Sequence, residues 1–295
     1  MTPVNAVCRV PNQHKVIPEV SKMKANKIFA LILTLILTLS FAAFAEGIPA
    51  PEGDDNVITV GATAVPHAQI LYDVVDGLLA DAGWKLEVVE FTDYVMPNTA
   101  LEEGELDANY FQTLGYMEQQ NADRGLHLYA AAGIHVEPMG LYSDKYASVE
   151  ELPDGASISI PNDVDNGGRA LQFLNDAGLL TLAETEATPT VADIAENPHS
   201  FKIVELEAAN LPHALPDVDG AVINGNYALE AKLEAPLLSE SFDEATFGRR
   251  LNYLVIREGN EDTLKTQALI AALAGQETRD YIADNYNGAV ITELP

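Results

Sequence analysis

Residues 158–171 form the stretch whose residue types best suit the binding of a small ligand. The apolar residues Ile158 and Ile160 predict a strand, and after a polar loop the sequence predicts a helix over 168–177, with Arg169 in its first turn. A helix N-terminus carries partial positive charge, and a guanidinium can hold a carboxylate by two hydrogen bonds. We therefore expect Arg169 to bind a ligand carboxylate. The alternative is that Arg169 pairs with a nearby aspartate of the protein.

Aromatic residues gather after two of the predicted strands. Tyr94 follows one strand, while Tyr110, Phe111 and Tyr116 cluster around the end of another. If these strand ends converge, the rings form an apolar box that can enclose a ligand side chain. The alternative is ordinary core packing, which is the more common role of such residues.

Two asparagines, Asn224 and Asn226, flank Gly225 directly after a predicted strand. A side-chain amide offers both donors and an acceptor, which suits the polar part of a small ligand. The pair Asn-Gly is also a strong turn signal, so a simple turn is the alternative interpretation.

The sequence gives little support for catalysis. The metalloprotease, phosphate-binding and serine-hydrolase motifs are absent, and the sole cysteine is Cys8. A hydrolase that uses two carboxylates stays open, because pairs of acidic residues arise by chance among 45 of them. We predict a protein that is not an enzyme and has no metal or cofactor. The histidines that follow the predicted export signal are not spaced as in a metal site, and we expect each of them to be a loop or core residue. They are His67, His127, His135, His199 and His213.

Strand patterns alternate with helix patterns along the chain, which predicts α/β architecture with mostly parallel sheets covered on both faces. Two such series, with a return to the first, predict two lobes with a ligand cleft between them. We expect strands at 57–61, 86–91, 106–111, 128–134, 139–143, 157–161, 201–206, 220–223 and 252–256, and helices at 68–82, 97–104, 115–124, 168–177, 261–274 and 276–284.

Residues 1–45 have the character of an export signal. Three lysines precede an apolar run over 28–39, and residues 43–45 read Ala-Phe-Ala, a small-x-small cleavage site. The run is short for a membrane span, although an uncleaved anchor is the alternative. Residues 1–22 lack signal character, so Met23 is a candidate start codon. We predict a soluble extracytoplasmic or periplasmic protein without disulfides.

The chain as a whole is acidic, and the part after the export signal divides into segments. With 16 basic and 45 acidic residues and a net charge of −29, its surface disfavours nucleic acid and anionic lipid as partners. Residues 46–56 form a polar, Pro- and Gly-bearing stretch, which predicts a disordered linker. We expect the first lobe to comprise 57–136 and 228–295, and the second lobe 137–227.

Eight motifs, in order along the chain, resemble the NlpA-type substrate-binding proteins of methionine ABC importers. The similarity extends from about residue 57 to the C-terminus. The motifs are VGATAVPH at 60–67, EFTDY at 90–94, ELDAN at 105–109, EPMGLY at 137–142, IPND at 160–163, GRAL at 168–171, ELEAA at 205–209 and AVINGNYA at 221–228.

The resemblance implies a two-lobed periplasmic-binding-protein fold that closes around L- or D-methionine and delivers it to an ABC permease with a cytoplasmic ATPase. By that resemblance, Arg169 would hold the α-carboxylate, and Asn166 and Asn224 the backbone of the amino acid, including its ammonium. The thioether would lie in the box of aromatic rings. The resemblance therefore implies the following side-chain and hinge positions: Tyr94, Phe111 and Tyr116 for the box, and Asn226, Tyr227 and 135–139 for hinge or secondary roles.

Two positions depart from the family pattern. Many members have His after Phe-Gln in the strand end that here reads Phe111-Gln112-Thr113, so Thr113 replaces an imidazole of the side-chain box. A methionine-containing dipeptide or another apolar amino acid is therefore an alternative ligand. Members are often lipoproteins, whereas Ala45-Glu46 stands at the expected cleavage point, which predicts an unlipidated protein. A surface interaction protein and a secreted enzyme are the alternatives of other classes.

Overall fold

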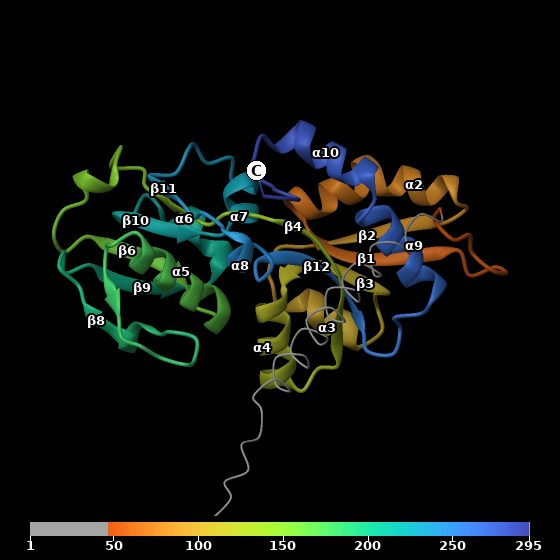
Figure 1. Ribbon diagram of the computed structural model, residues 1–295, viewed down its shortest axis with the longest axis horizontal. Helices are drawn as coiled ribbons and strands as arrows, with labels where there is room; N and C mark the ends of the chain where they lie inside the picture. Colours follow the sequence, from red (N-terminus) through yellow and green to blue (C-terminus); the bar gives the residue numbers. More distant parts are fainter. Residues whose placement is uncertain (1–46, 295) are drawn as a thin grey trace, which may run out of the picture. The chain divides into compact units, whose positions relative to one another are not determined.

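The structure is a computed structural model that describes residues 47–294. The predicted export signal over 1–45, its possible start at Met23 and Cys8 lie outside the described residues. Within 47–294, no helix is long and apolar enough to cross a membrane. The described chain is built on two five-stranded sheets (Figure 1).

The first sheet has the strand order β2-β1-β3-β12-β4. Strands β2, β1 and β3 are parallel, and β12 runs antiparallel between β3 and β4, so four of the five strands share one direction. The carboxyl ends of β1, β3 and β4 therefore meet at one edge. The strands are β1 (Val57–Thr63), β2 (Lys85–Phe91), β3 (Ala108–Thr113), β4 (Leu128–Val136) and β12 (Leu251–Arg257).

Helices cover both faces of the first sheet because apolar side chains alternate along its buried strands. Leu254 and Ile256 of β12 join one buried cluster, and Val255 between them joins the other. One face is covered by η2 (Ala64–Ala68), η3 (Leu71–Val75), α2 (Asp76–Asp81), α9 (Leu264–Leu273) and α10 (Gln276–Tyr286), and the other by α3 (Met96–Glu102) and α4 (Leu114–Arg124).

The second sheet has the order β11-β5-β10-β6-β9. Strands β10, β6 and β9 are parallel, and β5 runs antiparallel to both β10 and β11. This sheet too has four strands in one direction and one reversed strand. The strands are β5 (Gly140–Tyr142), β6 (Ser157–Pro161), β9 (Lys202–Leu206), β10 (Gly220–Ile223) and β11 (Leu238–Ser239).

The second sheet also has a buried cluster on each face, and β10 shows the alternation: Val222 belongs to one cluster, Ala221 and Ile223 to the other. Helix α5 (Val164–Asp176) covers the first face, while α6 (Leu211–Ala214) and α7 (Gly225–Glu230) cover the second. The shorter elements are η4 (Val149–Glu151), β7 (Thr181–Leu182), η5 (Val191–Asp193), β8 (Ile194–Glu196), η6 (Ala208–Asn210) and α8 (Glu244–Phe247).

The predicted α/β class and two-lobed arrangement are confirmed, but the helix that carries Arg169 begins earlier than predicted. The expected start was residue 168, whereas α5 begins at Val164 because Asp163 caps it, its Oδ1 accepting a hydrogen bond of 2.9 Å from the Asn166 N–H. This cap outweighs the two glycines that follow it in the helix. Arg169 is therefore in the second turn of α5, and the expectation that it lies in the first turn was wrong.

The chain crosses between the two sheets twice. It leaves the first sheet at the end of β4 and enters β5 at Gly140, and it returns from β11 to β12 through residues 240–250. Leu238 and Ser239 of β11 pair with β5, and Ala228 and Leu233 pack in a cluster of the second sheet, so the chain stays with the second sheet after α7. We therefore propose that the second lobe comprises 137–239, and the first lobe 57–136 and 251–294.

Residues 47–56 contain no helix or strand, and some of them contact the first lobe. Ile48 packs against its main cluster, and the Pro49 carbonyl accepts a hydrogen bond of 2.7 Å from the Trp84 indole N–H. Asp55 lies 3.0 Å from the ammonium of Lys265. The sequence predicted a disordered linker at 46–56. In the structure, the contacts of Ile48, Pro49 and Asp55 hold part of this segment against the first lobe.

Helix α7 approaches the outward crossing so closely that only glycine fits at its start. A Cβ at Gly225 would lie 2.7 Å from the Cβ of Glu137 and 2.9 Å from the carbonyl oxygen of Pro138. The neighbouring atoms belong to backbone or to the root of a side chain, so they cannot swing away. Gly225 thus sets the spacing between α7 and the crossing.

We predict that Gly225→Ala lowers the free energy of unfolding by about 1–3 kcal/mol, because the added methyl group overpacks this contact. Urea unfolding measures the change. Gly77→Ala is the matched control: it lies in α2 with no atom within 4 Å of the added Cβ, and we expect it to be neutral or stabilising by up to about 1 kcal/mol. Equal stability of the two variants would contradict the close approach.

Candidate functional site

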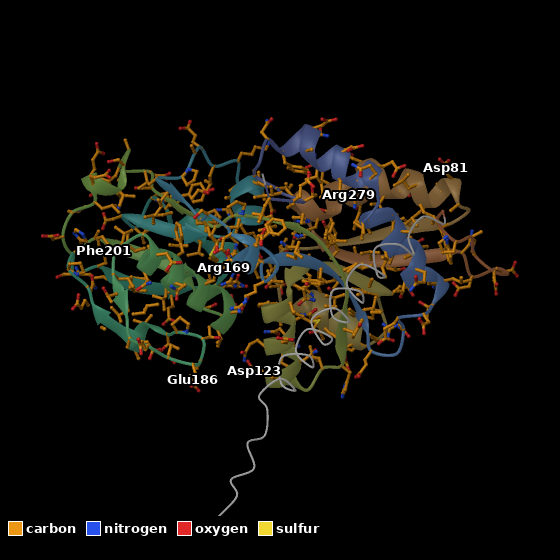
Figure 2. The ribbon with its side chains drawn as sticks, in the orientation of Figure 1. Asp81, Asp123, Arg169, Glu186, Phe201 and Arg279 are labelled. Atoms are coloured by element: carbon orange, nitrogen blue, oxygen red, sulfur yellow. The ribbon has the colours of Figure 1, made fainter. Side chains whose placement is uncertain are left out.

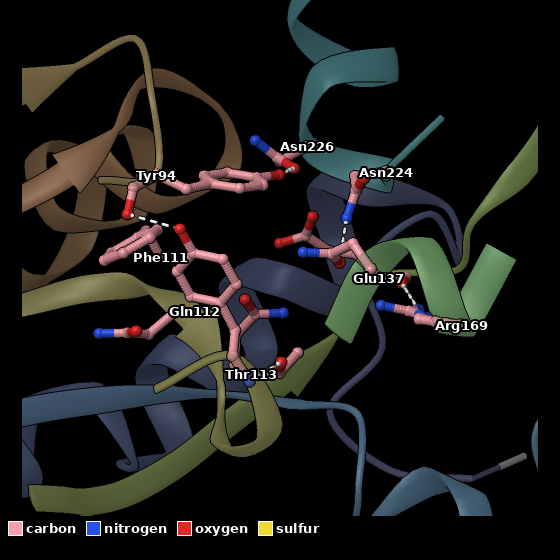
Figure 3. A pocket seen from close by; sticks show the side chains of 12 residues that line it. Tyr94, Phe111, Gln112, Thr113, Glu137, Arg169, Asn224 and Asn226 are labelled. Atoms are coloured by element: carbon pink, nitrogen blue, oxygen red, sulfur yellow. Dashed lines mark hydrogen bonds between the residues drawn. The ribbon is translucent and has the colours of Figure 1, made fainter. Parts of the chain in front are cut away.

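One pocket between the two lobes is lined by all eight residues that the sequence suggested for ligand binding (Figure 3). They come from both lobes and lie at or just beyond strand ends, as expected for α/β sheets. Among them only Tyr94 is partly exposed; the other side chains are buried. The eight are Tyr94, Phe111, Thr113, Tyr116, Asn166, Arg169, Asn224 and Asn226, and the structure adds Gln112, Glu137, Gly225 and Asn252.

Three aromatic rings lie together on the first-lobe side of the pocket. The ring centroid of Tyr94 is 5.7 Å from those of both Phe111 and Tyr116, and the latter two are 6.2 Å apart. Tyr116 OH donates a hydrogen bond of 3.1 Å to the Tyr94 backbone carbonyl, which holds the Tyr116 ring against the chain at Tyr94. Burial raises the pKa of Tyr94 well above its usual value, so its hydroxyl stays neutral. The rings present one apolar wall.

The two lobes touch directly at the pocket. Tyr94 OH donates a hydrogen bond of 2.6 Å to Asn226 Oδ1, and Thr113 Oγ1 donates one of 3.1 Å to Asp165 Oδ2 on α5. A Cβ at Gly115 would lie 2.4 Å from Asp165 Oδ1, so α4 and α5 pack closely there. Thr113 also caps α4, accepting from the Tyr116 N–H. Thr113 therefore joins the lobes.

A relay of amides fixes the polarity of the second-lobe side. The Asp163 carboxylate accepts from Asn166 Nδ2 at 3.0 Å, so Asn166 Oδ1 must face the other way, where it accepts from Asn224 Nδ2 at 2.7 Å. Asn224 Oδ1 is thereby left as an acceptor. Among buried side-chain atoms of the described residues, Asn224 Oδ1 and Asn226 Nδ2 both lack a hydrogen-bond partner. An unpaired acceptor and an unpaired donor thus lie at the pocket.

Arg169 (labelled in Figures 2 and 3) makes a protein ion pair as well as lining the pocket. Its Nε lies 3.0 Å from Glu240 Oε1, and the Nη2 group contacts Glu240 Oε2. Burial acts to lower the pKa of Arg169, but the charge and hydrogen bonds of Glu240 outweigh it and raise that pKa. The alternative considered from the sequence, that Arg169 pairs with an acidic residue of the protein, therefore holds, but the partner is a glutamate and not an aspartate. No described residue accepts a hydrogen bond from Nη1 of Arg169.

The same ion pair connects both crossings to α5. Arg169 Nη2 donates a hydrogen bond of 2.9 Å to the Glu137 carbonyl on the outward crossing. Glu240, on the return crossing, accepts at Oε2 from the Met139 N–H at 3.0 Å, and its own N–H donates to the Met139 carbonyl at 2.8 Å. Two segments about 100 residues apart are thereby held on one guanidinium. Arg169 therefore holds the two crossing segments together.

Glu137 carries a buried carboxylate that two histidines orient. His135 Nε2 lies 2.7 Å from Glu137 Oε1, and His67 Nε2 lies 3.2 Å from the same oxygen. The Nδ1 atoms are held in turn by hydroxyls: Thr63 Oγ1 is 2.8 Å from that of His67, and Tyr110 OH is 2.5 Å from that of His135. Since hydroxyls can donate to Nδ1, both imidazoles can stay neutral with Nε2–H as the donor: His135 donates to Glu137 Oε1, and His67 donates to Asn252 Oδ1 at 3.3 Å.

Burial determines the charge states in this cluster. It lowers the pKa of His135 to about 3 and that of His67 to about 4, with Glu137 opposing the second shift. Burial also raises the pKa of the Glu137 carboxyl; His67 when it is protonated, the charge of Arg169 and the Asn226 N–H act against this rise. The donor atoms of the three residues lie within 4.8 Å of one another, a grouping that can hold a metal ion. The hydrogen bonds from His135 to Glu137 at 2.7 Å and from His67 to Asn252 at 3.3 Å account for the cluster as it stands.

The sequence missed several residues of the site. Glu137 was expected only within 135–139, as a hinge or secondary position. The histidines were expected to be loop or core residues, and two of them, His67 and His135, are buried beside Glu137. One signal was present: Glu137 directly follows β4, and polar residues at strand ends were the feature that identified the others. Gln112 belongs to a buried amide cluster with Asn98 and Asn109, at 2.6 and 2.9 Å.

Comparison with protein families identifies the chain. A model of the NlpA lipoprotein family matches residues 58–294. The chain belongs to the NlpA lipoprotein family. This match covers both lobes and the whole pocket, and it confirms the resemblance that the eight motifs indicated.

Relatives within the NlpA family agree in fold and name. The methionine-binding lipoprotein MetQ of Bacillus subtilis is 36% identical over 271 residues, which cover 90% of this chain and 98% of MetQ. A solved structure of a nutrient binding protein from Burkholderia cenocepacia bound to methionine is 37% identical, with TM-score 0.75 over 80% of this chain and 100% of that one. An ABC transporter periplasmic substrate-binding protein from Coxiella burnetii is 35% identical, with TM-score 0.74, 80% coverage of this chain and 100% of its own. These relatives are named as binding proteins, and the first is named a lipoprotein.

We predict that Arg169→Ala lowers the free energy of unfolding by about 3–5 kcal/mol, because Glu240 stays largely buried without its partner. Urea unfolding gives the value. Lys85→Ala, which removes the exposed ion pair with Glu87, is the control and should cost less than about 1 kcal/mol. Replacing Arg169 by Met together with Glu240→Gln should recover part of the loss. If Arg169→Ala is as stable as the wild type, Arg169 does not hold the two crossings together.

We predict that the free energy of unfolding falls by at least about 3 kcal/mol between pH 6.5 and pH 4. His67 and His135 have lowered pKa values in the folded state, so the stability they contribute is present above pH 6.5 and is lost as the pH falls. Glu137, with its raised pKa, opposes this loss but is one group against two.

Urea unfolding at several pH values checks this prediction. His135→Gln should flatten the pH profile, whereas His199→Gln, at an exposed histidine, should leave it unchanged. A wild-type profile that is level between pH 6.5 and 4 would show that the two imidazoles are not held neutral by burial.

Proposed function

We propose that this protein is the substrate-binding protein of an ABC importer and that its ligand is methionine. The observation that carries the proposal is the pocket itself, where an aromatic wall faces a polar wall of amides and Arg169. The names of its relatives, a methionine-binding lipoprotein and a binding protein in complex with methionine, support the same ligand.

The two walls suit the two ends of a methionine molecule. A thioether is soft and apolar and packs well against ring edges, and Tyr94, Phe111 and Tyr116 supply such edges. We propose that Arg169 faces the carboxylate through Nη1, the part of the guanidinium that Glu240 leaves unbound. Asn226 Nδ2 is a further donor without a partner in the protein, and it suits the same carboxylate.

We propose that binding works by lobe closure. Lining residues come from both lobes, so a ligand in the pocket contacts both and stabilises the closed arrangement over an open one. The crossings at 137–139 and 240–250 are the segments on which such a motion would turn. The closed protein would then dock on an ABC permease driven by a cytoplasmic ATPase, in keeping with the transporter relative.

Location and substrate range follow from the same proposal. We propose an exported, extracytoplasmic protein without catalytic activity, unlipidated because Ala45-Glu46 stands where lipoproteins have cysteine. A methionine-containing dipeptide is the second candidate ligand. The dipeptide remains a candidate because of Thr113. This residue is bound to Asp165 and does not supply the imidazole that many family members have at this position.

We predict that methionine raises the melting temperature of residues 46–295, unfolded and refolded beforehand to remove bound ligand. At about 100 times the dissociation constant, the ligand adds about 2.7 kcal/mol of stability, a clear shift in a thermal-shift assay. The panel holds both enantiomers of methionine, other apolar amino acids and methionine-containing dipeptides. A shift with a dipeptide alone would transfer the proposal to that ligand, and no shift with any compound would refute the transport role.

A further inference from the structure

We infer that Glu137, oriented by His67 and His135 and joined by Asn224 Oδ1, is the receptor for the α-ammonium group of the ligand. This inference deepens the proposed function and rests on it, because it names the chemistry of one end of the same pocket. It makes Glu137 a specificity-determining residue that admits amines, and it makes Asn166 a positioning residue.

The first argument is the balance of charge at the pocket. Arg169 is the one cation among the lining residues, and its charge is already paired with Glu240. The Glu137 carboxylate is 5% exposed, and both imidazoles that contact it are held neutral by burial. A buried carboxylate without a full cationic partner is destabilised, and a cationic ligand group relieves that cost. The pocket is thus electrostatically complementary to an ammonium group.

The second argument is the direction of the hydrogen bonds. Both histidines approach Oε1 of Glu137, and no side chain of the described residues donates to Oε2. Asn224 Oδ1, whose orientation is set by the relay from Asp163 through Asn166, is a buried acceptor without a partner. An ammonium group has three donors and no acceptor, so it matches a carboxylate beside an amide oxygen.

The third argument is proximity. Glu137 and Asn224 line the same pocket, and the backbone between them is tightly packed: a Cβ on Gly225, next to Asn224, would lie 2.7 Å from the Cβ of Glu137. The Asn226 N–H also acts on the Glu137 carboxyl and lowers its pKa. The carboxylate and the start of α7 therefore form one side of the pocket, as Figure 3 shows for the labelled residues Glu137 and Asn224.

Asn166 takes a different role from the one that the resemblance implied. Its Nδ2 donates to Asp163 and its Oδ1 accepts from Asn224, so both ends of the amide are engaged within the protein. It holds Asn224 in the orientation that presents Oδ1, and it contacts the ligand less directly. The ammonium subsite therefore consists of Glu137 and Asn224.

The test compares methionine with 2-hydroxy-4-(methylthio)butanoate, which has a hydroxyl in place of the amine, by titration calorimetry on refolded protein. Wild type should bind methionine at least about 100-fold more tightly than the hydroxy acid. Glu137→Gln keeps the shape of the side chain and removes its charge, and it should weaken methionine binding by about 30-fold or more. It should change binding of the hydroxy acid by less than about threefold, because that compound brings no charge for Glu137 to neutralise.

The control is Glu186→Gln, the same change at an exposed glutamate labelled in Figure 2, and it should leave both affinities unchanged. Equal binding of methionine by Glu137→Gln and wild type would overturn the inference. Should that variant fail to fold, equal affinity of the wild type for methionine and the hydroxy acid would overturn it as well.

These outcomes are separable from failure of the proposed function. If wild type binds another amino acid in place of methionine, the ligand assignment fails, and the same comparison is made with that amino acid and its hydroxy analogue. A wild-type protein that binds no amine-bearing compound overturns both proposals. A Glu137→Gln variant that loses affinity equally for amine and hydroxy ligands assigns Glu137 a structural role and overturns the inference alone.

Discussion

The buried ion pair between Arg169 and Glu240 is the interaction on which the site depends. It joins α5 to the return crossing, and the same guanidinium holds the carbonyl of Glu137 on the outward crossing. Further hydrogen bonds offset the cost of desolvating such a pair, and Met139 supplies one of them to Glu240. The position of Glu137 therefore follows from that of Arg169, so one residue both lines the pocket and sets its frame.

On the polar side of the pocket, each hydrogen bond determines the direction of the next one. Asp163 accepts only, so Asn166 must turn its nitrogen toward it, and Asn224 must then turn its oxygen away from Asn166. Two hydroxyls similarly direct the imidazoles of His67 and His135 toward Glu137. Each choice leaves less freedom for the next, which makes the pocket preorganised before a ligand arrives. The unpaired amide atoms are costly in the protein alone and become favourable only with a matching ligand.

The sequence predicted most of the helices and all of the strands except the short β7, β8 and β11, because apolar residues repeat at the spacing of the element that buries them. It also placed Tyr94, Phe111 and Asn224 together, since residues at strand ends meet at one edge of a sheet. It could not place Glu137 or Glu240. Glutamates are abundant in this chain, and Arg169 lies 71 residues from its partner, so nothing local marks the pair. The start of α5 was mispredicted because the Asp163 cap, which the prediction did not include, outweighs the two glycines that follow it.

The contacts between the lobes bear on how affinity arises. Tyr94 with Asn226, and Thr113 with Asp165, are bonds between protein groups, so closure has a favourable contribution that no ligand supplies. A ligand shifts the equilibrium only by what it adds beyond those bonds. The close packing of Gly115 against Asp165 makes this contribution sensitive to small changes in shape. Residues that join the lobes can therefore tune affinity through closure, and Thr113, which forms a bond across the pocket to Asp165, is such a residue.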